Sequence, residues 1–234
     1  MKKNKLIIVG SGQVAEIVLY ISNYSEEISI EGVIIEDKKK LERLENLDKK
    51  VNFFAEDKDK ETILKRGIKN CVIAIGDMSK RRSVYMQYKE AGFSFPNIIH
   101  PKAIISKEVK LGEGNIIASG VNLYHNPEIG NCNIIGPNVG IAHHTAVKNY
   151  CNIALGANIG SRISIEDEVF VGIGATITPK RFGISQQLTI GERSIIGASA
   201  LVMQNVPGNS IVLGNKSKII PHNFEFFKSQ FFDD

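Results

Sequence analysis

The chain has 234 residues, a formal net charge of +4 and 43% hydrophobic residues. Its 29 basic and 25 acidic residues are spread along the sequence, so the composition does not indicate a nucleic-acid-binding surface. The first apolar stretch, at residues 6–9, is too short for a signal peptide or a membrane span. Cys71, Cys132 and Cys151 lack the spacing of a metal site or a disulfide framework. We therefore expect a cytoplasmic protein with reduced, packed cysteines and no membrane span.

The first hundred residues alternate between strand and helix patterns. A buried strand is expected at residues 6–9, followed by a glycine turn and a helix with apolar residues at helical spacing. Further strands are expected at 32–35 and 71–75, and a second helix ends at Gly92. This alternation predicts a small Rossmann-like domain over residues 1–97.

The turn after the first strand, at residues 10–15, matches the pattern G-x-G-x-x-G/A, and acidic residues follow about twenty positions later. Glycines let the backbone approach a phosphate, and a carboxylate can hold a ribose. The pattern favours a nucleotide ligand over a strand-to-helix turn alone, although both stay open. Because the domain has room for only one mononucleotide half, we expect a single nucleotide carrying a sugar rather than NAD. The candidate residues are Gly10, Gly12, Gln13, Glu36 and Asp37.

The second half of the chain contains a six-residue repeat of branched aliphatic residues. Such a period is neither helical nor a simple strand alternation, and it predicts a hexapeptide β-helix in which three hexads form one coil of eighteen residues. Small residues beside each aliphatic are expected to form the tight corners. The thirteen aliphatic residues are Ile105, Leu111, Ile117, Leu123, Ile129, Ile135, Ile141, Val147, Ile153, Ile159, Ile165, Val171 and Ile177.

The fold class predicted for the whole chain is therefore α/β plus β-solenoid, with the β-helix over residues 98–220. Ile190, Ile196 and Val202 resume the repeat after seven extra residues, which predicts a loop at residues 180–187. The tail at residues 221–234 holds five of the eleven phenylalanines. We expect this aromatic tail to dock on its own subunit or on a neighbouring one.

Histidines are the groups of the repeat that are suited to proton transfer near neutral pH. His125 and His143 are eighteen residues apart, so they are expected on one outer face in adjacent coils, with His144 beside them. A solvated or trimer-interface histidine stack is the structural alternative. A zinc site is a further alternative, but no carboxylate or glutamine cluster supports it.

These motifs together resemble the NeuD-type family of sugar acetyltransferases. The resemblance rests on the glycine turn, the sequence AIGD at residues 74–77 with Arg81 beyond it, the linker at residues 97–101, and a β-helix with a central histidine. The family includes N-acetyltransferases of UDP-4-amino sugars and of perosamine. It implies a left-handed parallel β-helix, a cytoplasmic homotrimer, a nucleotide-linked amino sugar held by the N-terminal domain, and acetyl-CoA between adjacent β-helices.

The resemblance also implies roles for individual residues. His143 corresponds to the general base that activates the acceptor for direct attack on the thioester, and His144 stands where the family has Glu or Asp. His125 is expected to contact His143 from the coil below. An O-acetyltransferase and a catalytically weakened nucleotide-sugar-binding trimer are the alternatives. The expected contacts to acetyl-CoA are Gly156, Ala157, Ser161, Ile173 and Ala198. Lys180 and Arg181 are added as contacts to its phosphates because of their position and charge. The resemblance also adds Gly76, Asp77 and Arg81 to the nucleotide-sugar site.

Overall fold

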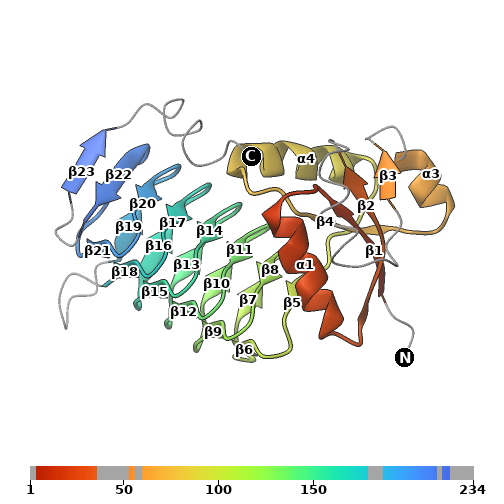
Figure 1. Cartoon of the computed structure of the whole chain (residues 1–234). Helices are drawn as coiled ribbons and strands as arrows, with labels where there is room; N and C mark the ends of the chain where they lie inside the picture. Colours follow the sequence, from red (N-terminus) through yellow and green to blue (C-terminus); the bar gives the residue numbers. More distant parts are fainter. Residues whose placement is uncertain (1–3, 36–52, 56–59, 179–186, 215–217, 222–234) are drawn as a thin grey trace. The chain divides into compact units, whose positions relative to one another are not determined.

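The computed structural model describes residues 4–35, 53–55, 60–178, 187–214 and 218–221 (Figure 1). The chain divides into two compact units, Met1–Pro101 and Lys102–Asp234. Several predictions fall outside the described residues: the acids Glu36 and Asp37, the cations Lys180 and Arg181 with most of their loop, and the phenylalanines of the tail.

The first unit contains a four-stranded parallel sheet in the order β3-β2-β1-β4. The central strand β1 is fully buried at Leu6, Ile7 and Ile8, as expected for a strand covered on both faces. The Rossmann-like prediction is confirmed. The strands are β1 (Asn4–Val9), β2 (Ile28–Ile35), β3 (Phe53–Ala55) and β4 (Asn70–Ile73); the helices are α1 (Gln13–Asn23), α3 (Lys60–Lys65) and α4 (Met78–Glu90); and β5 (Ile98–Ile99) lies near the end of the unit.

Helices α1 and α4 begin where the sequence predicts and α4 ends as expected, whereas the short helix α3 was not predicted. Gly12 is the N-cap of α1, which buries Ala15, Val18, Leu19 and Ile21. Asp77 caps α4, because its carboxylate accepts a hydrogen bond of 2.8 Å from the backbone N–H of Lys80. Helix α4 ends before Gly92, whose φ of 92° suits glycine.

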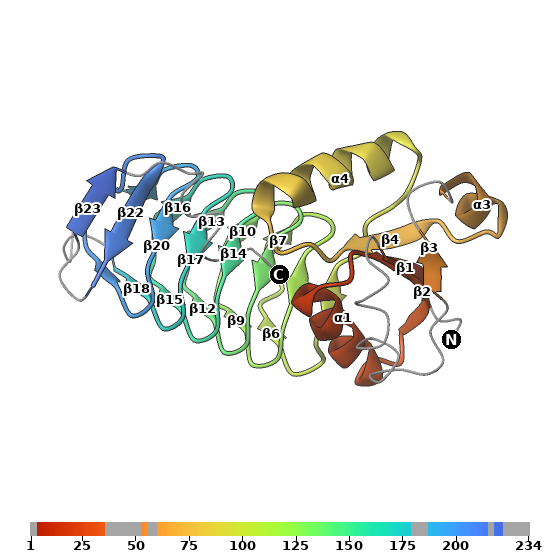
Figure 2. The ribbon, with the colours of Figure 1, turned by 45° about the horizontal axis from the view of Figure 1, so that its top comes forward.

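The second unit is a parallel β-helix, and the solenoid prediction is confirmed (Figure 2). Its strands form three walls, and each strand pairs in parallel with the strand one coil later, as in the pair Ile135 and Ile153. The first wall is β6-β9-β12-β15-β18-β21, the second is β7-β10-β13-β16-β19, and the third contains β8-β11-β14-β17-β20-β22-β23. Strand β23 pairs antiparallel with β22.

The strand bounds follow the six-residue repeat. They are β6 (Ile104–Ile105), β7 (Lys110–Leu111), β8 (Ile116–Ile117), β9 (Asn122–Leu123), β10 (Glu128–Ile129), β11 (Ile134–Ile135), β12 (Gly140–Ile141), β13 (Ala146–Val147), β14 (Asn152–Ile153), β15 (Asn158–Ile159), β16 (Ile163–Ile165), β17 (Phe170–Val171), β18 (Thr176–Ile177), β19 (Leu188–Ile190), β20 (Ile195–Ile196), β21 (Leu201–Val202), β22 (Ser210–Leu213) and β23 (Lys218–Pro221). The repeated aliphatic residue is the second residue of most strands and points into the prism. From Ile117 to Ile177 every one is buried.

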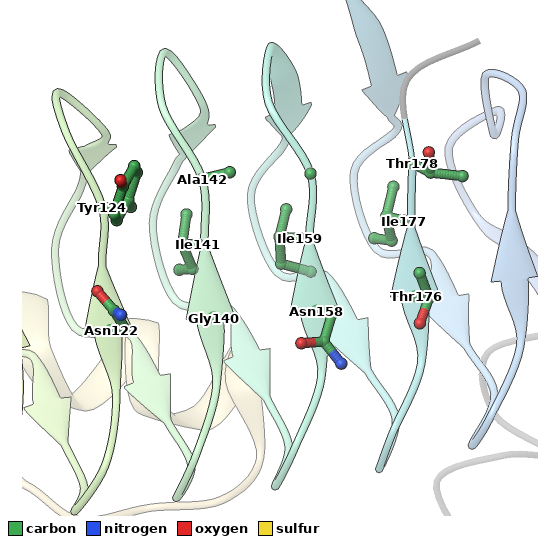
Figure 3. A pocket seen from close by; sticks show the side chains of 11 residues that line it. Asn122, Tyr124, Gly140, Ile141, Ala142, Asn158, Ile159, Thr176, Ile177 and Thr178 are labelled. Atoms are coloured by element: carbon green, nitrogen blue, oxygen red, sulfur yellow. The ribbon is translucent and has the colours of Figure 1, made fainter. Parts of the chain in front are cut away.

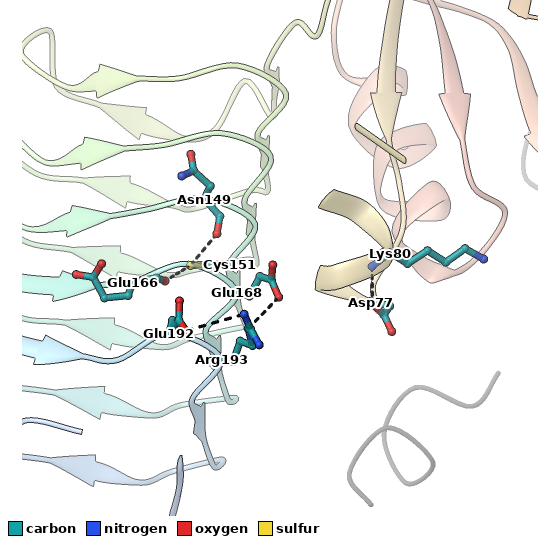
Figure 4. Close-up of polar contacts among 8 residues, drawn as sticks. All are labelled: Asp77, Lys80, Asn149, Cys151, Glu166, Glu168, Glu192 and Arg193. Atoms are coloured by element: carbon teal, nitrogen blue, oxygen red, sulfur yellow. Dashed lines mark hydrogen bonds and ion pairs between the residues drawn. The ribbon is translucent and has the colours of Figure 1, made fainter. Parts of the chain in front are cut away.

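Polar groups inside the prism are satisfied by the neighbouring coil. The side chain of Asn115 accepts a 2.9 Å hydrogen bond from the N–H of Asn133, and Asn133 accepts one of 2.8 Å from the N–H of Cys151. The thiol of Cys151 donates to the carbonyl of Glu166 at 3.0 Å (Figure 4). All three cysteines are buried and form no disulfide, as predicted.

Turn formation uses a position that the sequence analysis did not identify. From Leu111 to Val171, and again after Ile190 and Ile196, the third residue after the repeated aliphatic has a positive φ between 53° and 70°, and most of these residues are not glycine. Glycines directly after the aliphatic have a different function: a Cβ on Gly130 would lie 2.5 Å from the carbonyl oxygen of Lys148 in the next coil. The positive-φ row is Gly114, Gly120, Asn126, Cys132, Asn138, His144, Tyr150, Gly156, Arg162, Glu168, Gly174, Arg193 and Ser199.

Candidate active site

The predicted histidines occupy one edge of the prism, where the first wall turns into the second. We call this edge the histidine corner; it comprises residues 106–108, 124–126, 142–144 and 160–162 in successive coils. The ladder places these segments in register, because Leu123 pairs with Ile141 and Ile141 with Ile159. Thr178 and Gln187, which flank the predicted insertion, are attached to β18 and β19 at the same edge.

His143 and His144 contact each other directly. Their Nδ1 atoms lie 2.9 Å apart, and the ring planes are nearly perpendicular at 89°. One Nδ1 carries the shared proton and the other accepts it. His144 reaches this position because it adopts the positive φ of the corner, 57°, which turns the chain immediately after His143. The contact leaves Nε2 of His143 as the nitrogen available to a substrate.

The surroundings of His143 favour its neutral form. Partial burial is the largest cause that lowers the pKa of His143, followed by the charges of His144, Arg162 and His125. A neutral imidazole at neutral pH is able to accept a proton. The corner therefore provides a histidine in the protonation state that a general base requires.

A groove of about 530 Å³ runs beside His143. Both His125 and His143 line it, together with Ile104, Ser106, Asn122, Leu123 and Tyr124. Nδ1 of His125 lies 3.9 Å from the carboxylate of Glu108, which belongs to the coil below. The structure thus brings His125 and His143 into one open groove, next to a carboxylate that the sequence analysis did not consider.

A second groove of about 400 Å³ lies on the outer face of the first wall (Figure 3). The small residues Gly140, Ala142 and Gly160 do not project from this face, whereas Tyr124 beside them has 62% of its surface exposed. Tyr124 and Asn122 line both grooves. The outer face of the first wall therefore extends from the histidine corner as a shallow surface.

The residues predicted to contact acetyl-CoA divide between two edges of the prism. Ser161 belongs to the histidine corner, one coil above His143. Gly156, Ala157, Ile173 and Ala198 instead lie at the edge where the third wall turns into the first, which we call the glycine corner. Within one chain, the first wall separates these two sets.

Gly156 and Ala157, two of the predicted contacts to acetyl-CoA, already use their backbone N–H groups within the β-helix. The N–H of Gly156 donates to the carbonyl of Pro137 at 2.9 Å, and that of Ala157 donates to Ala154 at 3.2 Å. Both donors therefore already take part in the turn. A Cβ atom built on Gly156 would meet no atom within 4 Å, so the space beside this glycine is open.

Three charged residues of the histidine corner, Lys107, Glu108 and Arg162, were not predicted from the sequence. Glu108 and Arg162 stand at the same position of their coils as His144, thirty-six residues before and eighteen residues after it. The backbone N–H of Arg162 donates to the carbonyl of His143 at 3.2 Å. The eighteen-residue spacing that relates His125 to His143 was the available signal, and it applies equally to these two residues.

In the first unit, two glycine turns meet at the carboxyl ends of adjacent strands. Gly10 follows β1 and Gly76 follows β4; a Cβ on Gly10 would lie 2.6 Å from the carbonyl oxygen of Ala74. The strand order reverses between β1 and β4, and this switch point is where ligands bind in open parallel sheets. Gly12 has no atom within 4 Å of its Cβ direction, so the backbone at the start of α1 is open to a ligand.

Asp77 and Arg81 maintain the second glycine turn. The carboxylate of Asp77 already accepts a hydrogen bond as the N-cap of α4 (Figure 4). Arg81 is buried, and its Nη1 donates to the carbonyls of Ile75 at 2.6 Å and Gly76 at 3.2 Å. Both were predicted as contacts to the nucleotide-sugar, and the structure gives each a supporting position behind the turn. Gln13 is exposed at the first residue of α1.

Within the described ranges, no group of three His, Cys, Asp or Glu side chains is arranged to hold a metal ion. No helix in the same residues has the length and apolar character needed to cross a membrane.

Comparison with known proteins agrees with this architecture. Residues 5–88 match the PglD N-terminal domain family, whereas no curated protein matches the sequence significantly. PerB from Caulobacter crescentus, solved in complex with CoA and GDP-perosamine, is 25% identical with a TM-score of 0.81, and the match covers 92% of this chain and 97% of PerB.

Two other similar structures extend the comparison. The acetyltransferase domain of PglB from Neisseria gonorrhoeae is 20% identical with a TM-score of 0.77, covering 93% of this chain and all of that domain (100%). WeeI from Acinetobacter baumannii is 22% identical with a TM-score of 0.71, covering 92% and 100%. The predicted resemblance is confirmed: residues 5–88 match the PglD N-terminal domain family, and the chain as a whole shares the fold of PerB and of the acetyltransferase domain of PglB.

Proposed function

We propose that the protein is an acetyl-CoA-dependent acetyltransferase that modifies the amino group of a nucleotide-linked amino sugar in bacterial surface-glycan biosynthesis. The observation that carries the proposal is His143, whose Nδ1 is held by His144 while its lowered pKa keeps the ring neutral beside an open groove. The similarity to PerB, which was solved with CoA and GDP-perosamine, supports this substrate class.

The reaction requires one proton acceptor. Nε2 of His143 removes a proton from the acceptor amine as its nitrogen attacks the thioester carbonyl. A carbon–nitrogen bond forms, the carbon–sulfur bond breaks, and CoA leaves as a thiolate that takes up a proton. The products are the N-acetylated sugar and CoA thiol, and the histidine returns to its neutral state.

His144 takes the place of the usual acidic partner. With the shared proton on Nδ1 of His143, Nδ1 of His144 accepts the hydrogen bond and fixes the tautomer in which Nε2 is the base. When Nε2 gains a proton, the imidazolium donates the same hydrogen bond. A neutral imidazole stabilises that cation less than a carboxylate would, so His144 orients the base more than it strengthens it.

The nucleotide-sugar is assigned to the switch point of the N-terminal unit. The backbone at Gly12 and Gln13 is open at the start of α1, where the helix dipole favours a phosphate. Glu36 and Asp37 follow β2 in the sequence, and their assignment to the ribose or base remains a prediction. Arg81 acts indirectly by holding the Gly76 turn.

A homotrimer would bring the two halves of the acetyl-CoA site together. Ser161 lies on the histidine corner and Ile173 and Ala198 on the glycine corner of the same chain. In the proposed trimer, the histidine corner of one copy faces the glycine corner of the next in a heterologous interface, with acetyl-CoA between them. The phosphate contacts of Lys180 and Arg181 remain predictions.

The decisive experiment is a thiol-release assay with acetyl-CoA and UDP-, GDP- and dTDP-linked 3-amino and 4-amino sugars. We expect wild-type turnover on at least one amino sugar and its loss in His143→Asn. The corresponding hydroxyl sugars test the O-acetyltransferase alternative. Equal inactivity of wild type and His143→Asn on the whole panel, with nucleotide-sugar binding retained, would identify a catalytically weakened binding trimer. Light scattering of the same samples reports the oligomeric state.

A further inference from the structure

The histidine corner carries an uneven distribution of charge. Its described residues include the cations Lys107 and Arg162 and three histidines, whereas Glu108 is the one carboxylate among them. Proton transfer to His143 adds another positive charge at this edge. The residue that follows His143 is a histidine, so the nearest carboxylate on this edge belongs to another coil.

Glu108 is held in the ionised form and in a defined place. The hydroxyl of Ser106 donates to its Oε2, and its own backbone N–H donates to the carboxylate. The hydrogen bond from Ser106 is the largest cause that lowers the pKa of Glu108, with smaller contributions from its own N–H and from the charge of His125. The Oε2 atom that receives the Ser106 hydroxyl is also the one that lies 3.9 Å from Nδ1 of His125.

At 3.9 Å the carboxylate lies beyond hydrogen-bond distance of Nδ1 of His125, so it acts on this nitrogen through its negative charge. A carboxylate opposite Nδ1 favours the tautomer with the proton on Nδ1, and Nε2 is then left as an acceptor. His125 lines the groove that His143 also lines, and the two residues stand one coil apart, a separation of about 4.8 Å between equivalent backbone positions. Two imidazole acceptors in adjacent coils therefore face one groove.

Two acceptors match the number of protons on a primary amine. One N–H would be removed by Nε2 of His143, and the second would donate to Nε2 of His125, which orients the nitrogen lone pair for attack. A hydroxyl acceptor has a single proton and satisfies only one of the two histidines. The arrangement thus distinguishes amino from hydroxyl acceptors by hydrogen-bond count.

We infer that Glu108 is a positioning residue which, through Nδ1 of His125, sets the second imidazole acceptor of the groove and thereby selects an amine as the acetyl acceptor. The inference rests on the proposed acetyltransferase function. Ser106 supports it by fixing the carboxylate through the hydrogen bond to Oε2, and Ser106 and His125 both line the groove beside His143.

The first test compares Glu108→Gln with Glu108→Asp and with Glu128→Gln as the matched control. Glu128 is also an exposed carboxylate, but it lies on the second wall and pairs with Lys110 at 2.6 Å. We expect Glu108→Gln to lower kcat/KM for the amino sugar by about 10- to 100-fold, the range typical of removing a group that orients a metal-bound imidazole. The KM for acetyl-CoA should stay unchanged, Glu108→Asp should recover part of the loss, and Glu128→Gln should behave like wild type.

A double-mutant cycle decides whether the effect passes through His125. In a His125→Asn background, Glu108→Gln should cause no further loss, because the residue that it positions is already gone. The ratio of kcat/KM for amino sugar to that for hydroxyl sugar should fall in both single variants. Independent losses from the two substitutions, or an unchanged ratio, overturn the inference.

A measurement without substrate separates this inference from the proposed function. The nitrogen chemical shifts of histidine-labelled protein report the tautomer of His125. We expect the Nδ1-protonated form in wild type and a shift towards the Nε2-protonated form in Glu108→Gln, with Glu128→Gln unchanged. An identical tautomer in wild type and Glu108→Gln refutes the positioning role whatever the activity, whereas a wild type inactive on every sugar refutes the acetyltransferase proposal itself.

Discussion

Nδ1 of His143 and Nδ1 of His144 lie 2.9 Å apart, so the two neighbouring histidines share one proton. The geometry is possible because His144 has the positive φ of the corner, which turns its ring towards the preceding residue. This pair replaces the histidine–carboxylate pair that the family resemblance implies. Its consequences for the reaction are measurable.

Substitution of the two histidines should have unequal effects. His143→Asn removes the base and should lower kcat/KM by about 10² to 10⁴. His144→Asn should cost about tenfold or less, because the amide oxygen still accepts from Nδ1 and asparagine tolerates a positive φ. Steady-state kinetics with the best amino sugar measures both. A loss in His144→Asn as large as that in His143→Asn would contradict a purely orienting role for His144.

The pH dependence of activity should reflect the lowered pKa of His143. The neutral ring is the active form, so activity should fall as the pH drops through a pKa that lies below the ordinary value of about 6.5. Arg162→Gln removes a positive charge near the ring and should move this acidic limb to higher pH. Lys148→Gln, which changes an exposed cation directly after β13, is the control. A profile of kcat/KM against pH that does not move in Arg162→Gln would show that the guanidinium does not influence the base.

The glycines of the first turn should separate into a structural and a ligand-binding position. Gly10→Ala places a Cβ 2.6 Å from the carbonyl oxygen of Ala74 at a φ of 114°, and strain of this kind costs about 1–3 kcal/mol. Gly12→Ala meets no atom within 4 Å and should fold normally, yet its methyl group would obstruct a phosphate. Thermal unfolding and calorimetric titration of the nucleotide-sugar distinguish the two. Unchanged affinity in Gly12→Ala would argue against a phosphate at this turn.

The aliphatic column should dominate the stability of the β-helix. Ile135 is fully buried between Ile117 and Ile153, so Ile135→Ala should lower the free energy of unfolding by about 2–5 kcal/mol. Ile104→Ala removes the same atoms from a residue that is 66% exposed and should have little effect. Denaturant unfolding compares the two variants. Equal losses would indicate that the exposed position is covered in the assembled protein.

The positive-φ row predicts a specific sensitivity at the corners. Asn138→Val forces a β-branched residue into a φ of 56° and should cost about 1–2 kcal/mol, whereas Asn138→Gly should be nearly neutral. Asn138 is exposed, so lost packing does not explain a difference between the variants. Thermal unfolding tests the pair, and equal melting temperatures would count against backbone strain as the determinant.

Much of the fold was predictable because it depends on local periodicity. A side chain repeated every six residues stacks on its equivalent one coil later, so the walls, the inward column and the common edge of His125 and His143 follow from counting. The helix boundaries at Gly12, Asp77 and Gly92 were equally readable, because capping is local chemistry. The conformation of the corner residues was harder to predict, because Cys132, Tyr150 and Glu168 are not residue types that indicate a positive φ.

The sequence alone determined the two-part architecture, the register of the β-helix and the position of His143, because each of these depends on spacing along the chain. The tertiary structure decided how the exposed and buried polar groups are used. In the folded chain Arg81 lies behind the Gly76 turn, and the N–H groups of Gly156 and Ala157 donate to backbone carbonyls. Glu108 lies close to His125. These outcomes depend on side-chain direction and on partners in other coils or loops, and such contacts form only when distant segments are packed together.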